Sequence, residues 1–170
     1  MRRLTGSFAS ALAVAAAIAA TAGGVAGARS GSQPNPAVEI GTASVPKLGR
    51  VLVTGHGQVL YMFAPDGRSK VTCNAACQKI WPPDVAPRDG MAKAIRGAKQ
   101  SLIGSDRNPV DGRRIVTYHG WPLYRYVLDK KPHEAEGQNV GLSGGFWWVL
   151  TPAGKVNQTP VPHGAYEEGS

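Results

Sequence analysis

The amino-acid sequence predicts a mainly β protein in which two tandem hairpin units pack as one compact domain, with one short helix that carries a C-x-x-x-C pair. Residues 39–66 align without a gap with residues 102–129, and twelve of the 28 aligned positions are identical. Within each copy, β-branched and aromatic residues are typical of strands, and a His-Gly pair interrupts them. We therefore expect a tandem duplication, with repeat unit 1 at 39–85 and repeat unit 2 at 101–152.

The first 28 residues have the pattern of a secretory signal peptide. Arg2 and Arg3 precede an apolar, alanine-rich run, and an A-x-A cleavage pattern ends at Ala28. The apolar run is shorter than the roughly 20 residues that a membrane-spanning helix needs. No cysteine lies near the cleavage site. We expect a secreted or periplasmic, cell-envelope protein with neither a transmembrane segment nor a lipid anchor.

The formal net charge of +8 makes the chain basic. A basic exported protein favours anionic polymers or surfaces as partners. Nucleic acid is not expected, because no stripe of Lys and Arg is interleaved with aromatic residues. We expect flexible segments at 29–38 and 153–170 and a solvated connector at 86–100. The densest basic stretch falls in that connector and consists of Arg88, Lys93, Arg96 and Lys99.

Each unit is expected to contain a β-hairpin with a two-residue turn. The runs 50–63 and 113–126 are each broken by a His-Gly pair, which begins at His56 in the first and at His119 in the second. Glycine readily adopts the positive φ that such a turn needs, and histidine is among the residues that tolerate it. We interpret both histidines as turn residues. Metal ligation or proton transfer is the alternative.

A Y-x-[FWY]-x-x-D motif follows the turn in both units. In an extended strand the tyrosine and the second aromatic residue point to one face, and Leu60 and Met62 point to the other. The aspartate comes where the strand must end, and it can accept hydrogen bonds from the backbone of the following turn. We interpret the motif as a strand with its stop signal; the alternative is an acid/base or carbohydrate-stacking pair. The motif residues are Tyr61, Phe63, Asp66, Tyr124, Tyr126 and Asp129.

The two units diverge after the aspartate. In unit 1, Thr72 is expected to cap a short helix that Pro82 and Pro83 end. In unit 2, a glycine-rich loop leads to an aromatic strand at 146–151. The tryptophans are expected to complete the core: Trp81, Trp121, Trp147 and Trp148.

Several motifs in the same order resemble a known family. Besides the paired Y-x-[FWY]-x-x-D motifs, these are S-x-x-x-C-x-x-x-C-x-x-x-W-P-P at 69–83, DGRRIVTYHGWPLY at 111–124 and GQNVGLSGGFWWV at 137–149. Over about residues 38–152 the chain resembles the secreted-repeat lipoproteins of bacteria. The resemblance implies a secreted or lipid-anchored repeat of unknown function. This sequence lacks the lipobox cysteine of the lipoproteins, so membrane anchoring is not expected.

Cys73 and Cys77 are the two cysteines of the chain. In an exported protein such a pair is expected to form a disulfide, and residues four apart on a helix lie within bridging range. The alternative is a copper-binding or thiol redox site, because thiolates together with His56, His119 or Met62 would suit Cu(I). A thiol pair at a helix start can also have a lowered pKa.

Catalytic signatures are absent from the sequence. No G-x-S-x-G elbow, H-E-x-x-H pair, phosphate-binding loop or dinucleotide fingerprint occurs. We therefore expect no enzyme and no cofactor, with copper as the alternative cofactor. The leading hypothesis is a non-catalytic envelope or extracellular binding module whose partner the sequence does not name. The competing hypothesis is a copper-binding or thiol redox protein that uses the C-x-x-x-C pair.

Overall fold

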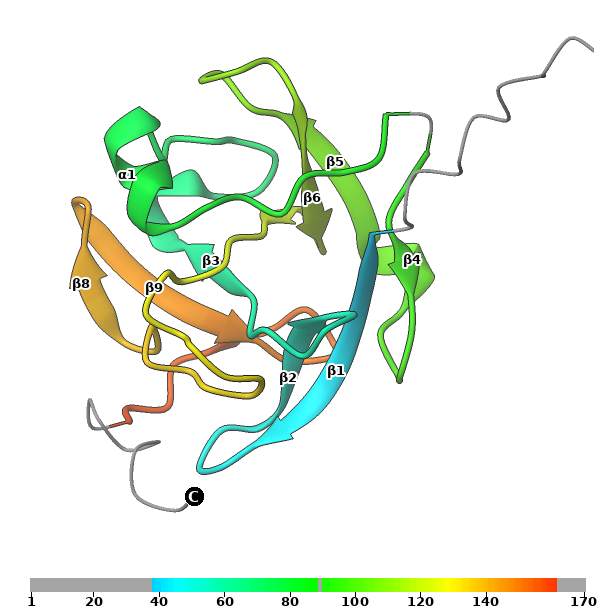
Figure 1. Ribbon diagram of the computed structural model, residues 1–170, viewed down its shortest axis with the longest axis vertical. Coiled ribbons are helices and arrows are strands. Elements are labelled where there is room, and N and C mark those ends of the chain that lie inside the picture. The colour runs from blue at the N-terminus through cyan, green and yellow to red at the C-terminus, as the bar shows by residue number, and fades with distance from the viewer. Residues whose placement is uncertain (1–37, 89, 162–170) are drawn as a thin grey trace, which may run out of the picture. The chain divides into compact units, whose positions relative to one another are not determined.

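Each repeat begins with an equivalent β-hairpin (Figure 1). A computed structural model describes residues 38–161 apart from residue 89. The predicted signal peptide, at 1–28, and residues 29–37 lie outside the described residues. The hairpin of the first repeat joins β1 (Glu39–Val45) to β2 (Gly49–Thr54), and that of the second joins β5 (Ile103–Arg107) to β6 (Arg114–Tyr118).

Three sheets are formed by the described residues. β1 pairs with β2 and, in parallel, with β4 (Lys93–Ala94), and β6 pairs with β5 and with β7 (Trp121–Pro122). The third sheet surrounds β9 (Gly145–Leu150), which pairs with β3 (Tyr61–Phe63), β8 (Val140–Leu142) and β10 (Val156–Asn157).

The end of each repeat pairs with the other repeat. β3 belongs to the first repeat, yet it pairs antiparallel with β9 of the second, so that Tyr61 lies opposite Val149. Tyr124, which is the counterpart of Tyr61 in the second repeat, bridges Pro83 at the end of the first repeat. Tyr61 and Tyr124 also bridge each other through N–H···O bonds of 2.8 and 3.0 Å. The predicted fold class is therefore confirmed, and the two units share the sheet around β9 as well as their core.

The prolines limit one of these two pairings. Pro82 and Pro83 have no backbone N–H, so they cannot extend a ladder as β9 does beside β3. Three bonds remain across this junction, donated by the N–H groups of Asp84, Arg125 and Val127. The first repeat consequently ends in a bridge rather than in a full strand.

The two His-Gly turns differ. His119 and Gly120 have φ values of 52° and 81°, and Tyr118 pairs with Trp121, as the predicted two-residue turn requires. In the first repeat the turn starts one residue earlier, because Thr54 accepts a bond from the N–H of Gly57. The two-residue prediction is wrong there. Gly55 occupies the position of Tyr118 and has no side chain with which to continue the strand.

The alternation along β3 divides the core into two clusters. Tyr61 and Phe63 point into an aromatic cluster, and Leu60 and Met62 point into an aliphatic cluster. All four side chains are at most 3% exposed. The aromatic cluster also holds Trp81, Trp147 and both cysteines, and the aliphatic cluster also holds Ile40, Leu52, Val116, Leu123 and Leu150.

Helix α1 (Ala75–Ile80) has its N-cap two residues after the predicted cap. Its N-cap is Asn74, whose Oδ1 accepts from the N–H groups of Ala76 and Cys77. The prediction of Thr72 as the cap is wrong, because both the N–H and the hydroxyl of Thr72 donate to Asp66. The chain leaves the helix at Trp81 and enters the two prolines, as expected.

Two segments predicted to be solvated or flexible take part in the fold. The connector contributes β4 and the 3-10 helix η2 (Gln100–Leu102), and Arg96 donates from Nη2 to the carbonyl of Gly55 over 2.7 Å. The C-terminal segment contributes β10, and Val161 is 5% exposed. β10 pairs with the open edge of β9, and residues 162–170 of the predicted tail lie outside the described residues.

The described residues contain one further 3-10 turn, η1 (Ala64–Asp66), directly after β3. No helix in the described part of the chain has the length and apolar character needed to cross a membrane.

Candidate functional site

The repeated tyrosine-aspartate motif is interlocked between the repeats. The hydroxyl of Tyr61 donates to Oδ2 of Asp129 over 2.7 Å, and the hydroxyl of Tyr124 donates to Oδ2 of Asp66 over 2.5 Å. Each tyrosine thus binds the aspartate of the other repeat. The sequence did not reveal this arrangement, because the bonded residues lie 68 and 58 positions apart in the chain.

The second oxygen of each aspartate holds the turn that follows its own strand. Oδ1 of Asp66 accepts from the N–H and hydroxyl of Thr72 and from the N–H of Cys73, at 2.6, 2.7 and 3.1 Å. Oδ1 of Asp129 accepts from the N–H of Glu136 at 2.9 Å. Asp66 is 0% exposed and Asp129 is 8% exposed. Each carboxyl is therefore buried and ties the turn of one repeat to the tyrosine of the other.

Burial shifts the titration of these groups. The pKa of Tyr124 lies well above its usual range, first because of burial and then because of the negative charge of Asp66 and the hydrogen bond to it. Burial raises the pKa of Asp129 to about 7, although hydrogen bonds from Tyr61 and from the N–H of Glu136 act in the opposite direction. Tyr124 is consequently a neutral donor at physiological pH, and Asp129 titrates close to physiological pH.

Four aromatic rings stack beside these pairs. Phe63 lies on Trp147 with ring centroids 4.3 Å apart, Trp147 lies on Trp81 at 3.9 Å, and Trp81 lies on Tyr126 at 4.1 Å. Phe63 and Tyr126 are the equivalent residues of the two motifs, and they form the two ends of the stack. A Cβ atom at Gly137 would come within 2.8 Å of the Trp81 ring, so this glycine permits the close approach of its loop. The stack draws on both repeats and occupies the centre of the aromatic cluster.

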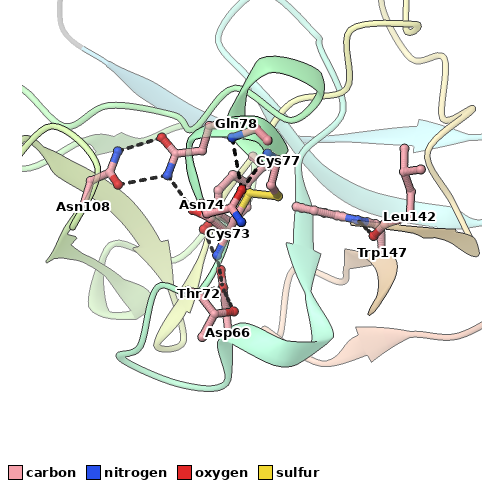
Figure 2. Close-up of a disulfide and its surroundings, with 11 residues drawn as sticks. Asp66, Thr72, Cys73, Asn74, Cys77, Gln78, Asn108, Leu142 and Trp147 are labelled. Carbon is pink, nitrogen blue, oxygen red and sulfur yellow. Dashed lines mark hydrogen bonds between the residues drawn. A yellow bond between two sulfur atoms is a disulfide. The ribbon is translucent and has the colours of Figure 1, made fainter. Parts of the chain in front are cut away.

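A disulfide joins Cys73 and Cys77, whose Cα atoms are 5.4 Å apart (Figure 2). Both cysteines are buried, at 1% and 4% exposed. The side-chain amide of Gln78 on α1 donates to the carbonyl of Cys73 and exchanges two 2.9 Å hydrogen bonds with the amide of Asn108 (Figure 2). Because Asn108 follows β5, this amide pair fastens the disulfide-bearing helix to the second repeat.

The other residues of the copper hypothesis lie apart from the disulfide. Met62 packs in the aliphatic cluster, on the opposite face of β3 from the cluster that contains the cysteines. His56 is exposed, and Nδ1 of His119 lies 3.2 Å from the carbonyl oxygen of Gly154. Across residues 38–161 without residue 89, no three His, Cys, Asp or Glu side chains are grouped so as to hold a metal ion.

A pocket of about 240 Å³ lies between the His-Gly turn that follows β2 in the first repeat and Arg125 of the second repeat. Two carboxylates, one guanidinium and one imidazole line it together with smaller groups. The described lining residues are Val38, Glu39, Thr54, Gly55, His56, Gln58, Asp84 and Arg125.

Asp84 and Arg125 are held in this pocket by the backbone junction between the repeats. The N–H of Asp84 donates to Leu123, its carbonyl accepts from Val116, and the N–H of Arg125 donates to Pro82, at 2.9, 2.7 and 2.9 Å. Unlike these backbone groups, one side-chain atom of each of the two residues lacks a hydrogen-bond partner in the described part of the chain. Oδ2 of Asp84 and Nε of Arg125 are buried, and neither has a hydrogen-bond partner among the described residues.

The electrostatics of Asp84 reflect this lack of partners. Burial raises its pKa to about 6, and the positive charge of Arg125 only partly offsets the effect. Desolvation thus outweighs the attraction between two charges that line one pocket. An unsatisfied buried carboxylate and an unsatisfied guanidinium nitrogen can receive a donor and an acceptor from a ligand.

Sequence reasoning missed Glu39, Asp84 and Arg125. One clue was present, because Arg125 aligns with the buried Met62 of the first repeat, so a charge replaces an apolar residue at the equivalent position. His56 was identified, as a turn residue, and it also lines the pocket.

The fold and the interlocked motifs define a protein built from two β repeats that complete each other. The family described as a secreted repeat of unknown function matches residues 42–83 and 107–151, which fall in the first and second repeats respectively. The chain belongs to this family, as the resemblance of its motifs predicted. Comparison with curated proteins and comparison with solved structures both give no match.

Proposed function

We propose that this secreted repeat protein is a non-catalytic binding module that holds an envelope or extracellular component in the pocket between its repeats. The observation that carries the proposal is the pair of buried, unpartnered atoms in that pocket, Oδ2 of Asp84 and Nε of Arg125. Leaving a buried polar group without a partner costs about 1–3 kcal/mol. A ligand that pairs with both atoms recovers that cost on binding.

The contrast with the interlocked motif supports this choice of site. The carboxylates of Asp66 and Asp129 are already bonded to tyrosines and to turn N–H groups, so each of their oxygens already has a hydrogen-bond partner. The pocket is also bounded by both repeats, since Thr54 and Arg125 come from different units. Duplication therefore serves the site as well as the core.

Sedimentation with purified peptidoglycan sacculi tests the proposal. Wild-type protein should pellet with the sacculi and release no soluble product, whereas Asp84→Asn/Arg125→Gln protein should bind at least tenfold more weakly. Asp111→Asn/Arg113→Gln is the matched control, because it makes the same charge changes in an exposed turn. No pelleting by the wild type, or equal pelleting by the pocket variant, would refute the proposal for this polymer class.

The copper-binding or thiol redox hypothesis predicts a different result. Reduced protein would take up Cu(I) stoichiometrically, and Cys73→Ser/Cys77→Ser protein would lose that uptake. Intact mass with thiol labelling of the secreted protein provides the first check. The binding-module proposal expects a mass two hydrogens below that of the reduced chain, with no labelled thiol.

A further inference from the structure

The pocket places opposite charges within one small space. Glu39 and Asp84 present carboxylates, and Arg125 presents a guanidinium whose positive charge acts on Asp84. The volume of about 240 Å³ falls below the roughly 300–1,000 Å³ of pockets that enclose drug-sized molecules. The ligand must therefore be small, and it must match both charge signs.

Ligands of other charge types fit this lining less well. A neutral molecule would bring no charge opposite to those of Asp84 and Arg125, so it would offset less of the cost of burying them. A simple anion would face Glu39 and Asp84, and a simple cation would face Arg125; like charges placed together in a desolvated site repel. A molecule that carries a positive and a negative group a few bonds apart can place each of them beside a pocket residue of opposite charge.

We infer that the pocket binds a small zwitterion of amino-acid size, with its ammonium group at Asp84 and Glu39 and its carboxylate at Arg125. This inference rests on the proposed binding function and names the chemical class of the ligand. The ammonium group donates to Oδ2 of Asp84, and the carboxylate accepts from Nε of Arg125. Charge-assisted bonds of this kind are about twice as strong as neutral ones.

Binding of this kind displaces a proton. Since burial keeps part of Asp84 protonated near pH 6, an ammonium group beside it favours the ionised carboxylate and drives the proton into solution. The other titratable or charged groups that line the pocket are Glu39, His56 and Arg125. His56→Asn therefore serves to show that a released proton does not come from the imidazole.

Calorimetric titration with the twenty standard amino acids is the test. At least one should bind, and its two half-ligands, the amine and the carboxylic acid that each keep one charged group, should bind at least tenfold more weakly. Asp84→Asn and Arg125→Gln should each weaken the zwitterion at least tenfold, with Asp111→Asn unchanged. At pH 6, titrations in buffers of different ionisation enthalpy should show proton release in wild-type and His56→Asn protein but not in Asp84→Asn protein.

The outcomes separate this inference from the proposed function. If no amino acid binds, or if a half-ligand binds as tightly as the zwitterion, the zwitterion inference is wrong. Sacculus binding that still depends on Asp84 and Arg125 would then leave the proposed function standing. If sacculus binding and amino-acid binding both fail, neither survives.

Discussion

Asp66 and Asp84 represent two ways of burying a carboxylate in one small protein. Asp66 accepts four hydrogen bonds, from Thr72 twice, from Cys73 and from Tyr124, and it joins the repeats. Asp84 lies at the same junction, but its buried Oδ2 has no partner in the described chain and its pKa is raised to about 6. The comparison separates polar groups that hold the fold together from polar groups that remain available to a ligand.

The largest effect is expected from Asp66→Ala. The substitution leaves the Tyr124 hydroxyl and the N–H groups of Thr72 and Cys73 buried without an acceptor, so the free energy of unfolding should fall by about 4 kcal/mol. Urea denaturation of the wild-type and variant proteins measures this change in the free energy of unfolding. Asp111→Ala, in an exposed turn, is the control and should change little. A loss for Asp66→Ala no larger than that of the control would contradict the interlocked role.

Crowding of the aromatic stack should have the next largest effect. In Gly137→Ala protein the new Cβ would lie 2.8 Å from atoms of Trp81 and of Tyr61, and such overpacking typically costs about 1–3 kcal/mol. Gly90→Ala adds the same methyl group where nothing lies within 4 Å and serves as the control. If both variants unfold at the same urea concentration, the stack is not as closely packed as described.

The pH dependence of stability isolates Asp129. Its folded-state pKa of about 7 lies above the ordinary value of 3.8, so the unfolded chain loses the proton first as pH rises. The stability that the protonated Asp129 contributes is fully present below pH 4, and it is lost as pH rises through about 7. We expect the free energy of unfolding to fall between pH 4.5 and 7.5 by on the order of 2 kcal/mol more in wild type than in Asp129→Asn protein. Parallel pH profiles would refute this assignment.

Removing the disulfide should have a moderate and local effect. The bond closes a loop between residues only four apart, for which the chain-entropy relation gives about 2 kcal/mol or less. The amide pair of Gln78 and Asn108 still fastens α1 to the second repeat. Cys73→Ser/Cys77→Ser protein should therefore fold with a lowered melting temperature in calorimetry. An unfolded variant would show that the disulfide, rather than the interlocked motifs, holds the repeats together.

The sequence predicted the local features of the fold well. The repeat, the alternating faces of β3, the short helix and an aromatic strand at 146–151, against the observed Gly145–Leu150, all follow from patterns within a few residues. The spacing of Cys73 and Cys77 likewise predicted a disulfide. Such patterns are readable because strand and helix periods are local properties of the chain.

Features that depend on distant partners were not predicted. The pairing of β3 with β9 and the bond from Tyr124 to Asp66 join residues far apart in the sequence, and periodicity does not identify a strand's partner. Composition predicts a flexible segment at 153–170, and it does not reveal that β10 within this segment pairs with β9. The pocket was missed for the same reason, since Glu39, Asp84 and Arg125 meet only after the repeats interlock.

One measurement tests the central distinction most directly: the free energies of unfolding of Asp84→Asn and Asp66→Asn protein at pH 8, by urea denaturation against wild type. Removing the charge of Asp84 ends a desolvation that Arg125 only partly offsets, so that variant should be as stable as wild type or more stable. Asp66→Asn should be less stable by at least about 2 kcal/mol, because its amide replaces a carboxylate that accepts four hydrogen bonds. An Asp84→Asn protein destabilised as much as Asp66→Asn would show that Asp84 holds the fold and would contradict its assignment to the binding site.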